Sequence, residues 1–226
     1  MIDFSIAISS FNRVDCIKEC LSSMIASLDK CQNYEIVVVD NSSRKDIKEY
    51  LYSINKSIRV IDNYPVSGGD VSNHNKKFEV CYGKYIYHCC DNNLIINKNK
   101  RNWLQDIRDV FNAEQDSKVA VIMNELSTSR VACLQGQINW NCMPKMKIKD
   151  VEYAILGTPY THNFPVMGYT YRKDYFNIIG NFETDNNKLI EYNHIWRYLR
   201  RGFKFAVVLN SALTTQITRT RNMRNF

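Results

Sequence analysis

Residues 35–43, EIVVVDNSS, decide the fold class of this 226-residue chain. Glu35–Val39 is a short apolar run rich in β-branched residues, which predicts a buried strand. Asp40-Asn41-Ser42-Ser43 follows at once and gathers residues that favour turns. A buried strand that ends directly on a polar cluster is typical of α/β proteins, whose ligands bind beyond the carboxyl ends of the strands.

The same alternation of strand and helix occurs on both sides of this stretch. Before it, FSIAIS at Phe4–Ser9 predicts a strand, and Val14–Leu28 predicts a helix with Asp15 at its N-cap or in its first turn. After it come a short helix at Asp46–Ile54 and a strand at Ile58–Ile61. Such alternation predicts an α/β fold, with a mostly parallel central sheet flanked by helices.

The alternation continues through the rest of the chain. Ser72–Cys81 predicts a helix with Gly83 as its C-cap, and Lys84–Cys89 predicts a strand that stops at Asp91-Asn92-Asn93. Residues 124–170 are mixed and rich in loops. The sequence further predicts helices at Asn102–Phe111, Lys173–Ile179 and Lys188–Arg201, and strands at Val119–Met123 and Lys204–Val208.

Three polar clusters follow predicted parallel strands. They are Ser9–Arg13, Asp40–Ser43 and Asp91–Asn93. Because the carboxyl ends of parallel strands meet at one edge of a sheet, we expect these clusters to form a single ligand site.

The composition limits the partners of this site. A net charge of +7 favours anionic partners, and Arg219, Arg221 and Arg224 concentrate positive charge near the C-terminus. This basic tail is interpreted either as a solvated segment or as a contact to diphosphate or to a lipid-linked acceptor at a membrane surface. Elsewhere Lys and Arg are dispersed without interleaved aromatic residues, so the alternative of a nucleic-acid-binding protein is disfavoured.

The cysteines and the apolar runs indicate the compartment. The eight cysteines include no C-x-x-C pair, so we expect no structural zinc site. We expect the cysteines to be reduced thiols. No apolar run approaches the roughly 20 residues that span a bilayer, and no signal peptide is recognised. We therefore expect a cytoplasmic protein, with peripheral membrane contact through the basic C-terminus as a further hypothesis.

Read in order, the clusters resemble the motifs of glycosyltransferase family 2. The resemblance runs from residue 4 to about 205 and implies a GT-A, nucleotide-sugar-binding fold. It implies one continuous domain, with a nucleotide-sugar-binding half at 1–95 and an acceptor-binding and catalytic-base half at 96–226. The matching segments are Ser9–Arg13, Val38–Ser43, Tyr82–Ile86 with Asp91-Asn92-Asn93, and Gly180-Asn181-Phe182 with Glu191 and Trp196-Arg197.

The resemblance implies inverting transfer of a hexose or deoxyhexose from a UDP- or dTDP-sugar to a hydroxyl of a glycan or lipid-linked acceptor, as in polysaccharide biosynthesis. It places Asn41 at the base-reading position and Phe11 against the base, with Ser9, Arg13 and Asp40 completing the nucleotide site. The edge of uracil or thymine offers acceptor, donor and acceptor groups, which carboxyl or amide groups and nearby backbone can pair. Asp40 is expected either to read the base or to brace the turn.

Asp91-Asn92-Asn93 departs from the family pattern at the metal and diphosphate position. The resemblance implies Mn²⁺ or Mg²⁺ here, and hard cations prefer carboxylates, of which only Asp91 is one. Two alternatives stay open. Either cationic side chains, Arg13 or the C-terminal arginines, assist the leaving group, or the chain is a catalytically degenerate relative that binds nucleotide sugar without transfer.

The remaining candidates concern catalysis and the acceptor. By resemblance Glu191, at a predicted helix start, is the general base, with Glu183 and Asp185 as competitors. His88 is expected to be packed or solvated rather than a ligand. A sugar nucleotidyltransferase is disfavoured because Ser9–Arg13 contains no glycine. Trp140, His162 and Tyr169 are candidates for the acceptor pocket, because aromatic faces stack on sugar rings. Trp140 and Tyr169 are alternatively residues of the core.

Overall fold

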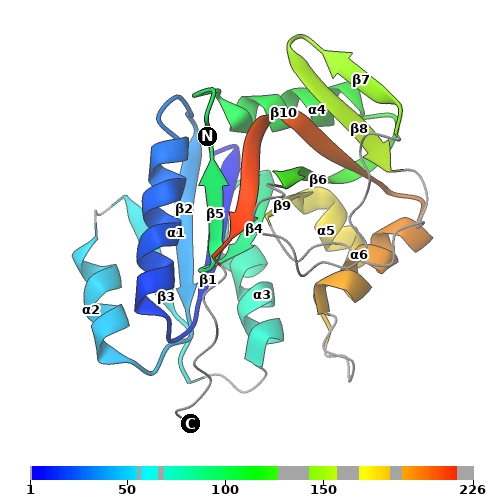
Figure 1. The fold of residues 1–226 in the computed structure, drawn as a ribbon. Helices are drawn as coiled ribbons and strands as arrows, with labels where there is room; N and C mark the ends of the chain where they lie inside the picture. The colour runs from blue at the N-terminus through cyan, green and yellow to red at the C-terminus, as the bar shows by residue number, and fades with distance from the viewer. Residues whose placement is uncertain are drawn as a thin grey trace.

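The computed structural model describes residues 2–54, 57–65, 69–126, 143–156, 168–183 and 190–217. Within these residues a single ten-stranded sheet carries helices on both faces (Figure 1). The strands are β1 (Phe4–Ser10), β2 (Tyr34–Asp40), β3 (Ile58–Asp62), β4 (Tyr85–Cys90), β5 (Asn93–Ile96), β6 (Val119–Leu126), β7 (Lys145–Ile148), β8 (Val151–Leu156), β9 (Tyr169–Arg172) and β10 (Lys204–Gln216). The helices are α1 (Val14–Ser27), α2 (Lys45–Ser53), α3 (Gly69–Val80), α4 (Trp103–Ala113), α5 (Lys173–Ile179) and α6 (Ile190–Arg200).

The first half of the sheet is fully parallel, as predicted. Its strands lie in the order β3-β2-β1-β4. In this register Ser10 pairs with Asp40, and Ser9 pairs with Cys90. The carboxyl ends of β1, β2 and β4 are therefore level, and the polar residues that follow them start from the same edge.

The second half of the sheet is mixed. β6 and β10 run parallel to each other, but β9 lies antiparallel between β4 and β6, and β8 lies antiparallel on β10. Four strands were not predicted. One of them, β5, is only four residues long. β7 and β8 lie within the loop-rich stretch at 124–170, and β9 begins at its end. β10 extends the predicted strand to Gln216 through a register shift between Val208 and Leu213.

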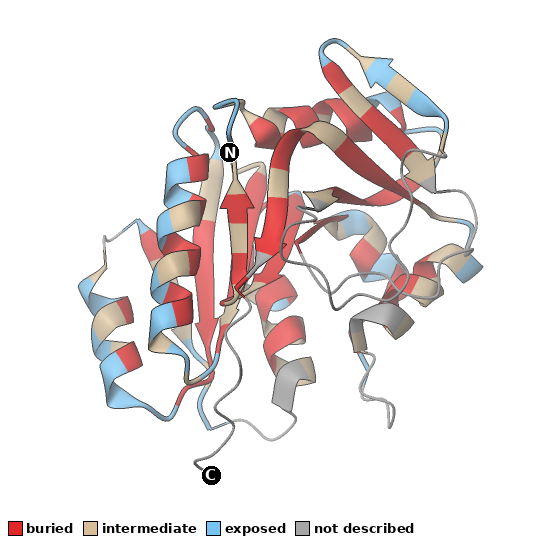
Figure 2. Ribbon diagram, in the orientation of Figure 1, coloured by how far each residue is buried: buried red, intermediate tan, exposed pale blue. Residues whose placement is uncertain are grey.

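Two apolar layers hold the helices against the sheet (Figure 2). Successive strand residues face opposite layers: Ile6 and Ile8 of β1 pack with α1, α2 and α4, whereas Ala7 packs with α3, α5 and α6. Burial on both faces explains why the strands have continuous apolar runs rather than alternating polar residues.

Of the two predicted helix-end signals, Asp15 is confirmed and Gly83 is not. Asp15 lies in the first turn of α1, whose N-cap residue is Arg13, and Gly180 is the C-cap of α5 with a φ of 87°. α3 ends at Val80, so the prediction of Gly83 as its C-cap is wrong. Gly83 instead lies against β1, where a Cβ would approach the backbone nitrogen of Ser5 to 2.5 Å. Its lack of a side chain serves the close approach of two backbones.

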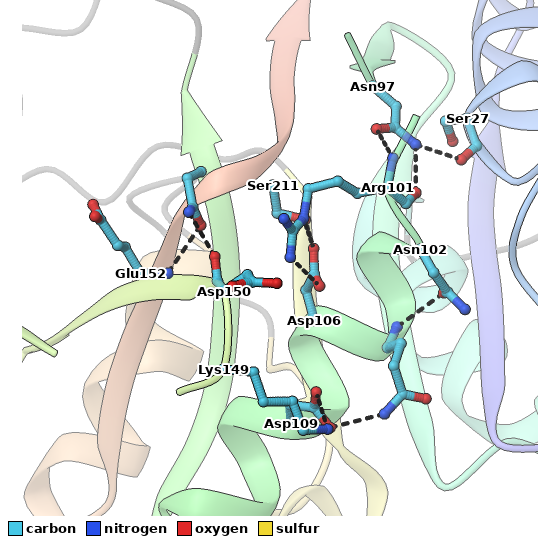
Figure 3. Close-up of polar contacts among 12 residues, drawn as sticks. Ser27, Asn97, Arg101, Asn102, Asp106, Asp109, Lys149, Asp150, Glu152 and Ser211 are labelled. Carbon is cyan, nitrogen blue, oxygen red and sulfur yellow. Dashed lines mark hydrogen bonds and ion pairs between the residues drawn. The ribbon is translucent and has the colours of Figure 1, made fainter. Parts of the chain in front are cut away.

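A polar network fixes α4 against the second half of the sheet (Figure 3). Asp106 is buried and accepts hydrogen bonds from Ser211 Oγ at 2.5 Å and Arg101 Nε at 2.8 Å. One turn along α4, Asp109 accepts a hydrogen bond from Lys149 Nζ at 2.7 Å. Since Ser211 lies within the register shift of β10, its hydrogen bond to Asp106 joins α4 to that strand where the pairing is irregular.

The cysteines of the described ranges form no disulfide with one another; they are Cys16, Cys20, Cys31, Cys81, Cys89 and Cys90. Cys133 and Cys142 lie outside those ranges. In the part of the chain that the structure describes, no helix is long and apolar enough to cross a membrane.

Candidate functional site

The three polar clusters predicted to share a site meet at the carboxyl edge of the parallel strands. The Asn41 N–H donates to the Ser10 carbonyl at 3.0 Å, and the Asp91 N–H donates to the Ser9 carbonyl at 2.9 Å. The last two residues of β1 are thus flanked by the residues that follow β2 and β4.

Hydrogen bonds among Asn12, Asp40, Ser42 and Ser43 join the loop after β1 to the loop after β2, and we call these four residues the latch. The Asn12 N–H donates to Ser42 Oγ at 2.9 Å, and the Ser43 N–H donates to Asn12 Oδ1 at 3.1 Å. Asn12 has a φ of 52°, a left-handed conformation that asparagine tolerates better than most residues. Ser42 Oγ in turn donates to Asp40 Oδ1 at 2.6 Å. Asp40 therefore braces this turn, which was one of its two expected roles.

Asn41 and Phe11 stand out beside this latch. Asn41 is 9% exposed, and its buried Oδ1 accepts no hydrogen bond from a described residue. An unpaired buried carbonyl costs about 1–3 kcal/mol, so a donor from a ligand is favoured there. Phe11 is a large apolar side chain that is 49% exposed at the same edge. The hydroxyls of Ser9 and Ser10 are likewise buried without a described partner.

Asp91 connects the end of β4 to the loop after β1. Its carboxylate has no exposed surface, accepts the Phe11 N–H at 3.2 Å and forms an ion pair with the guanidinium of Arg13. Burial raises the pKa of Asp91 to about 6, against the opposing pull of Arg13 and Lys77. The side chain of Arg13 is 41% exposed, so the pair spans the interior and the surface.

The residues after Asp91 do not fit a site for a divalent cation. Asn93 is 1% exposed and its Oδ1 accepts the Cys90 N–H at 2.8 Å, while the carbonyl of Asn92 accepts the Ile217 N–H at 2.8 Å. The carboxylate of Asp91 is already bound to Arg13 and Phe11. Among the residues that the structure describes, no group of three or more His, Cys, Asp or Glu side chains could hold a metal ion.

Sequence reasoning missed a buried lysine below this edge. Lys77 of α3 has no exposed surface, and its Nζ donates to the Cys89 carbonyl at 3.0 Å. Nothing in the pair Lys76-Lys77 distinguishes the buried residue from its half-exposed neighbour. Sequence reasoning also missed Ser42, which was named only as part of a polar turn.

An aromatic stack connects the end of β4 to α6. His88 is 3% exposed, and burial, together with the charge of Lys77, holds its pKa well below the usual range. Its ring centroid lies 5.5 Å from that of Phe182, which lies 4.0 Å from that of His194 in α6. His88 is thus packed, as expected, and the stack links β4 to α6 through Phe182.

The candidates for catalysis and the acceptor are placed unequally. Glu191 is the second residue of α6, at the predicted helix start. Glu183 is paired with Arg197. Tyr169 is 1% exposed in β9 and belongs to the core, so it packs against Tyr171 rather than lining an open surface. Trp140, His162 and Asp185, like the C-terminal arginines, lie outside the described residues.

Solved structures with the same fold are glycosyltransferases. TarS from S. aureus matches with a TM-score of 0.65 at 16% identity, over 94% of this chain and 36% of that one. TarS 1–349 in complex with UDP-GlcNAc matches with 0.61 at 16% identity, over 93% and 56%. The mannosyltransferase PcManGT from Pyrobaculum calidifontis, in complex with GDP-Man and Mn²⁺, matches with 0.61 at 13% identity, over 92% and 56%. This chain therefore spans less than two thirds of these proteins and shares their GT-A fold.

Sequence comparison identifies the family. A search of curated proteins found no match. The model of glycosyl transferase family 2 matches residues 5–129, which include the latch, Asn41, Arg13 and the segment from Asp91 to Asn93. The match covers more than half of the chain and contains all three strand ends that form the candidate site. The chain therefore belongs to glycosyltransferase family 2.

Proposed function

We propose that this protein is an inverting glycosyltransferase that moves a hexose or deoxyhexose from a UDP- or dTDP-sugar to a hydroxyl of a glycan or lipid-linked acceptor. The donor assignment is carried by two features of one strand edge: Asn41 Oδ1 is a buried acceptor without a partner among the described residues, and the ring of Phe11 is exposed.

The chemistry of a pyrimidine fits these groups. The ring N–H lies between two carbonyls, and Asn41 Oδ1 is a suitable acceptor for that N–H. Backbone groups near Ser9–Phe11 can pair with the flanking carbonyls. The face of Phe11 offers a stacking surface, and base–aromatic stacking contributes about 1–3 kcal/mol.

The transfer itself needs a base and a leaving group. Glu191 is the second residue of α6, and acidic residues are favourable near the N-terminus of a helix. In the proposed reaction Glu191 takes the proton of the acceptor hydroxyl as its oxygen attacks the anomeric carbon. The bond from that carbon to the diphosphate oxygen breaks, and the nucleoside diphosphate leaves with the bonding pair.

The acceptor is assigned from the sequence. Trp140 and His162 are proposed to contact it, and the basic C-terminus to approach a membrane surface in the cytoplasm; both rest on the sequence alone. The complexes of similar folds with UDP-GlcNAc and GDP-Man support a nucleotide-sugar donor of some kind. A second candidate, a protein that binds nucleotide sugar without transfer, is favoured by the amides of Asn92 and Asn93 at the family's acidic position.

Isothermal titration calorimetry with UDP, dTDP, GDP and ADP tests the donor class. We expect UDP or dTDP to bind at least about tenfold more tightly than the purine nucleotides, since one mismatched buried hydrogen bond costs about 1–3 kcal/mol. Equal affinities would refute the pyrimidine assignment. Release of UDP from UDP-sugars distinguishes an active transferase from a binding-only relative.

A further inference from the structure

We infer that this site neutralises the diphosphate of its donor with the side chain of Arg13 and binds it without a divalent cation. This inference rests on the proposed nucleotide-sugar function and specifies how the diphosphate is held. A departing diphosphate accumulates negative charge, which requires either a metal ion or cationic side chains close by.

The first observation is that the carboxylate of Asp91 is fully engaged. Its Oδ2 accepts the Phe11 N–H at 3.2 Å and the Arg13 Nε–H at 3.3 Å, and its Oδ1 accepts a hydrogen bond from Arg13 Nη2. The side chain has no exposed surface. A metal ion would have to displace a guanidinium from the single carboxylate of the Asp91–Asn93 segment.

The second observation is that the neighbouring oxygens do not compensate. Asn93 Oδ1 is turned back to the Cys90 N–H and is buried, and Asn92 offers at most a neutral amide. Asp40, the other buried carboxylate at this edge, accepts both the N–H and the hydroxyl of Ser42 through Oδ1. Mg²⁺ usually requires one or two carboxylates in addition to phosphate and water, so this donor set is poor.

The third observation is that Arg13 is positioned for an anion. Asp91 holds the Nε and Nη2 side of the guanidinium, while 41% of the side chain remains exposed. The planar fork of donors on a guanidinium matches the oxygens of a phosphate. Arg13 is also the N-cap residue of the 14-residue helix α1, so the positive end of the helix dipole lies beside it.

The fourth observation concerns the charge balance. Lys77 lies buried under the end of β4, with its Nζ on the Cys89 carbonyl, and interacts electrostatically with Asp91. Asp91 is therefore shared between two cations. Part of the positive charge of Arg13 stays available to a ligand, as a diphosphate requires.

Calorimetry with UDP provides the test. In EDTA and in Mn²⁺ we expect the same Kd within about twofold, because no metal bridges the diphosphate. Arg13→Ala should weaken UDP binding about 10- to 100-fold, as expected for loss of hydrogen bonds to a charged group, and should leave uridine binding unchanged. Arg44→Ala is the matched control, because Arg44 follows β2 at the same edge, is 51% exposed and pairs with Asp46.

Asp91→Asn separates the two models most sharply. It removes the only carboxylate that a metal could use in this segment, yet frees Arg13, so we expect UDP affinity to be kept or increased. Comparison with the double variant Arg13→Ala, Asp91→Asn measures Arg13 without leaving a buried carboxylate unpaired, should Arg13→Ala alone fail to fold.

The outcomes are distinct. UDP binding that requires Mn²⁺ and is lost in Asp91→Asn overturns this inference and leaves the proposed function standing. An equal loss of affinity in Arg13→Ala and Arg44→Ala also overturns it, because general electrostatics would then explain the effect. If no pyrimidine nucleotide binds with or without metal, the proposed function fails as well.

Discussion

The Phe11 N–H donates to Oδ2 of Asp91 at 3.2 Å, across 80 positions of sequence. One buried carboxylate therefore ties the loop after β1 to the end of β4. Because this carboxylate lies where the strand ends meet, its protonation affects both the stability of the fold and the shape of the site.

The raised pKa of Asp91 predicts a specific pH dependence. The folded protein binds this proton with a pKa of about 6, above the ordinary value of 3.8, so the contribution of Asp91 is most favourable below pH 3.8 and is lost as pH rises through 6. Relative to Asp91→Asn, the wild type should lose about 3 kcal/mol of unfolding free energy over that window.

Urea denaturation of both proteins at pH values from below 4 to above 6 measures this difference. The difference between the two proteins is required because other carboxyls, such as those of Asp62 and Asp174, have lowered pKa values and act in the opposite direction. A stability difference that does not change with pH would mean that Arg13 fully offsets the effect of burial on the pKa of Asp91. A difference that grows in favour of the wild type as pH rises would mean that Arg13 dominates.

Asn41→Ala should separate binding from stability. Removing the unsatisfied Oδ1 should weaken UDP binding about 10- to 100-fold, because one buried hydrogen bond to the base is lost. The free energy of unfolding should not fall, since the carbonyl makes no hydrogen bond with a described residue. Asn41→Asp, which retains an acceptor, is the control. A large loss of stability with unchanged UDP binding would assign Asn41 a structural role instead.

Gly83→Ala should destabilise the sheet beneath the site. A Cβ there would lie 2.5 Å from Ser5 N and 2.7 Å from Phe4 C, and these are backbone atoms of β1 that cannot move without opening the β1–β4 pairing. We expect a loss of about 3 kcal/mol. Gly202→Ala, with open space around it and a φ of +76°, should cost about 1 kcal/mol from backbone strain alone. Chemical denaturation ranks the two, and an equal or smaller cost for Gly83→Ala would contradict the steric argument.

The sequence predicted the first half of the fold well for a physical reason. Glu35–Val39 and Phe4–Ser9 are buried on both faces, so each has a continuous apolar run that is recognisable in the sequence. β5 and β7 were missed because they are only four residues long and partly exposed, so pairing with β10 and with β8 defines them.

The site was only partly predictable. Its three clusters follow from strand ends, but the roles within them depend on contacts between residues far apart in the chain. Nothing local indicates that Ser42 joins Asn12 to Asp40, or that Lys77 is buried near Asp91. Tyr169 is an aromatic residue of the type that stacks on sugar rings, but it lies in the core because β9 inserts between β4 and β6.

Glu191→Gln tests the proposed base. The substitution keeps size and hydrogen bonding but removes proton affinity, so turnover should fall about 10²- to 10⁴-fold while UDP binding is retained. The measurement is the rate of UDP release from UDP-sugars, with water or added glycan as acceptor, beside calorimetry with UDP. Glu183→Gln is the matched control, because Glu183 is 75% exposed and paired with Arg197. Near-normal turnover in Glu191→Gln, with loss in Asp185→Asn, would move the role to Asp185.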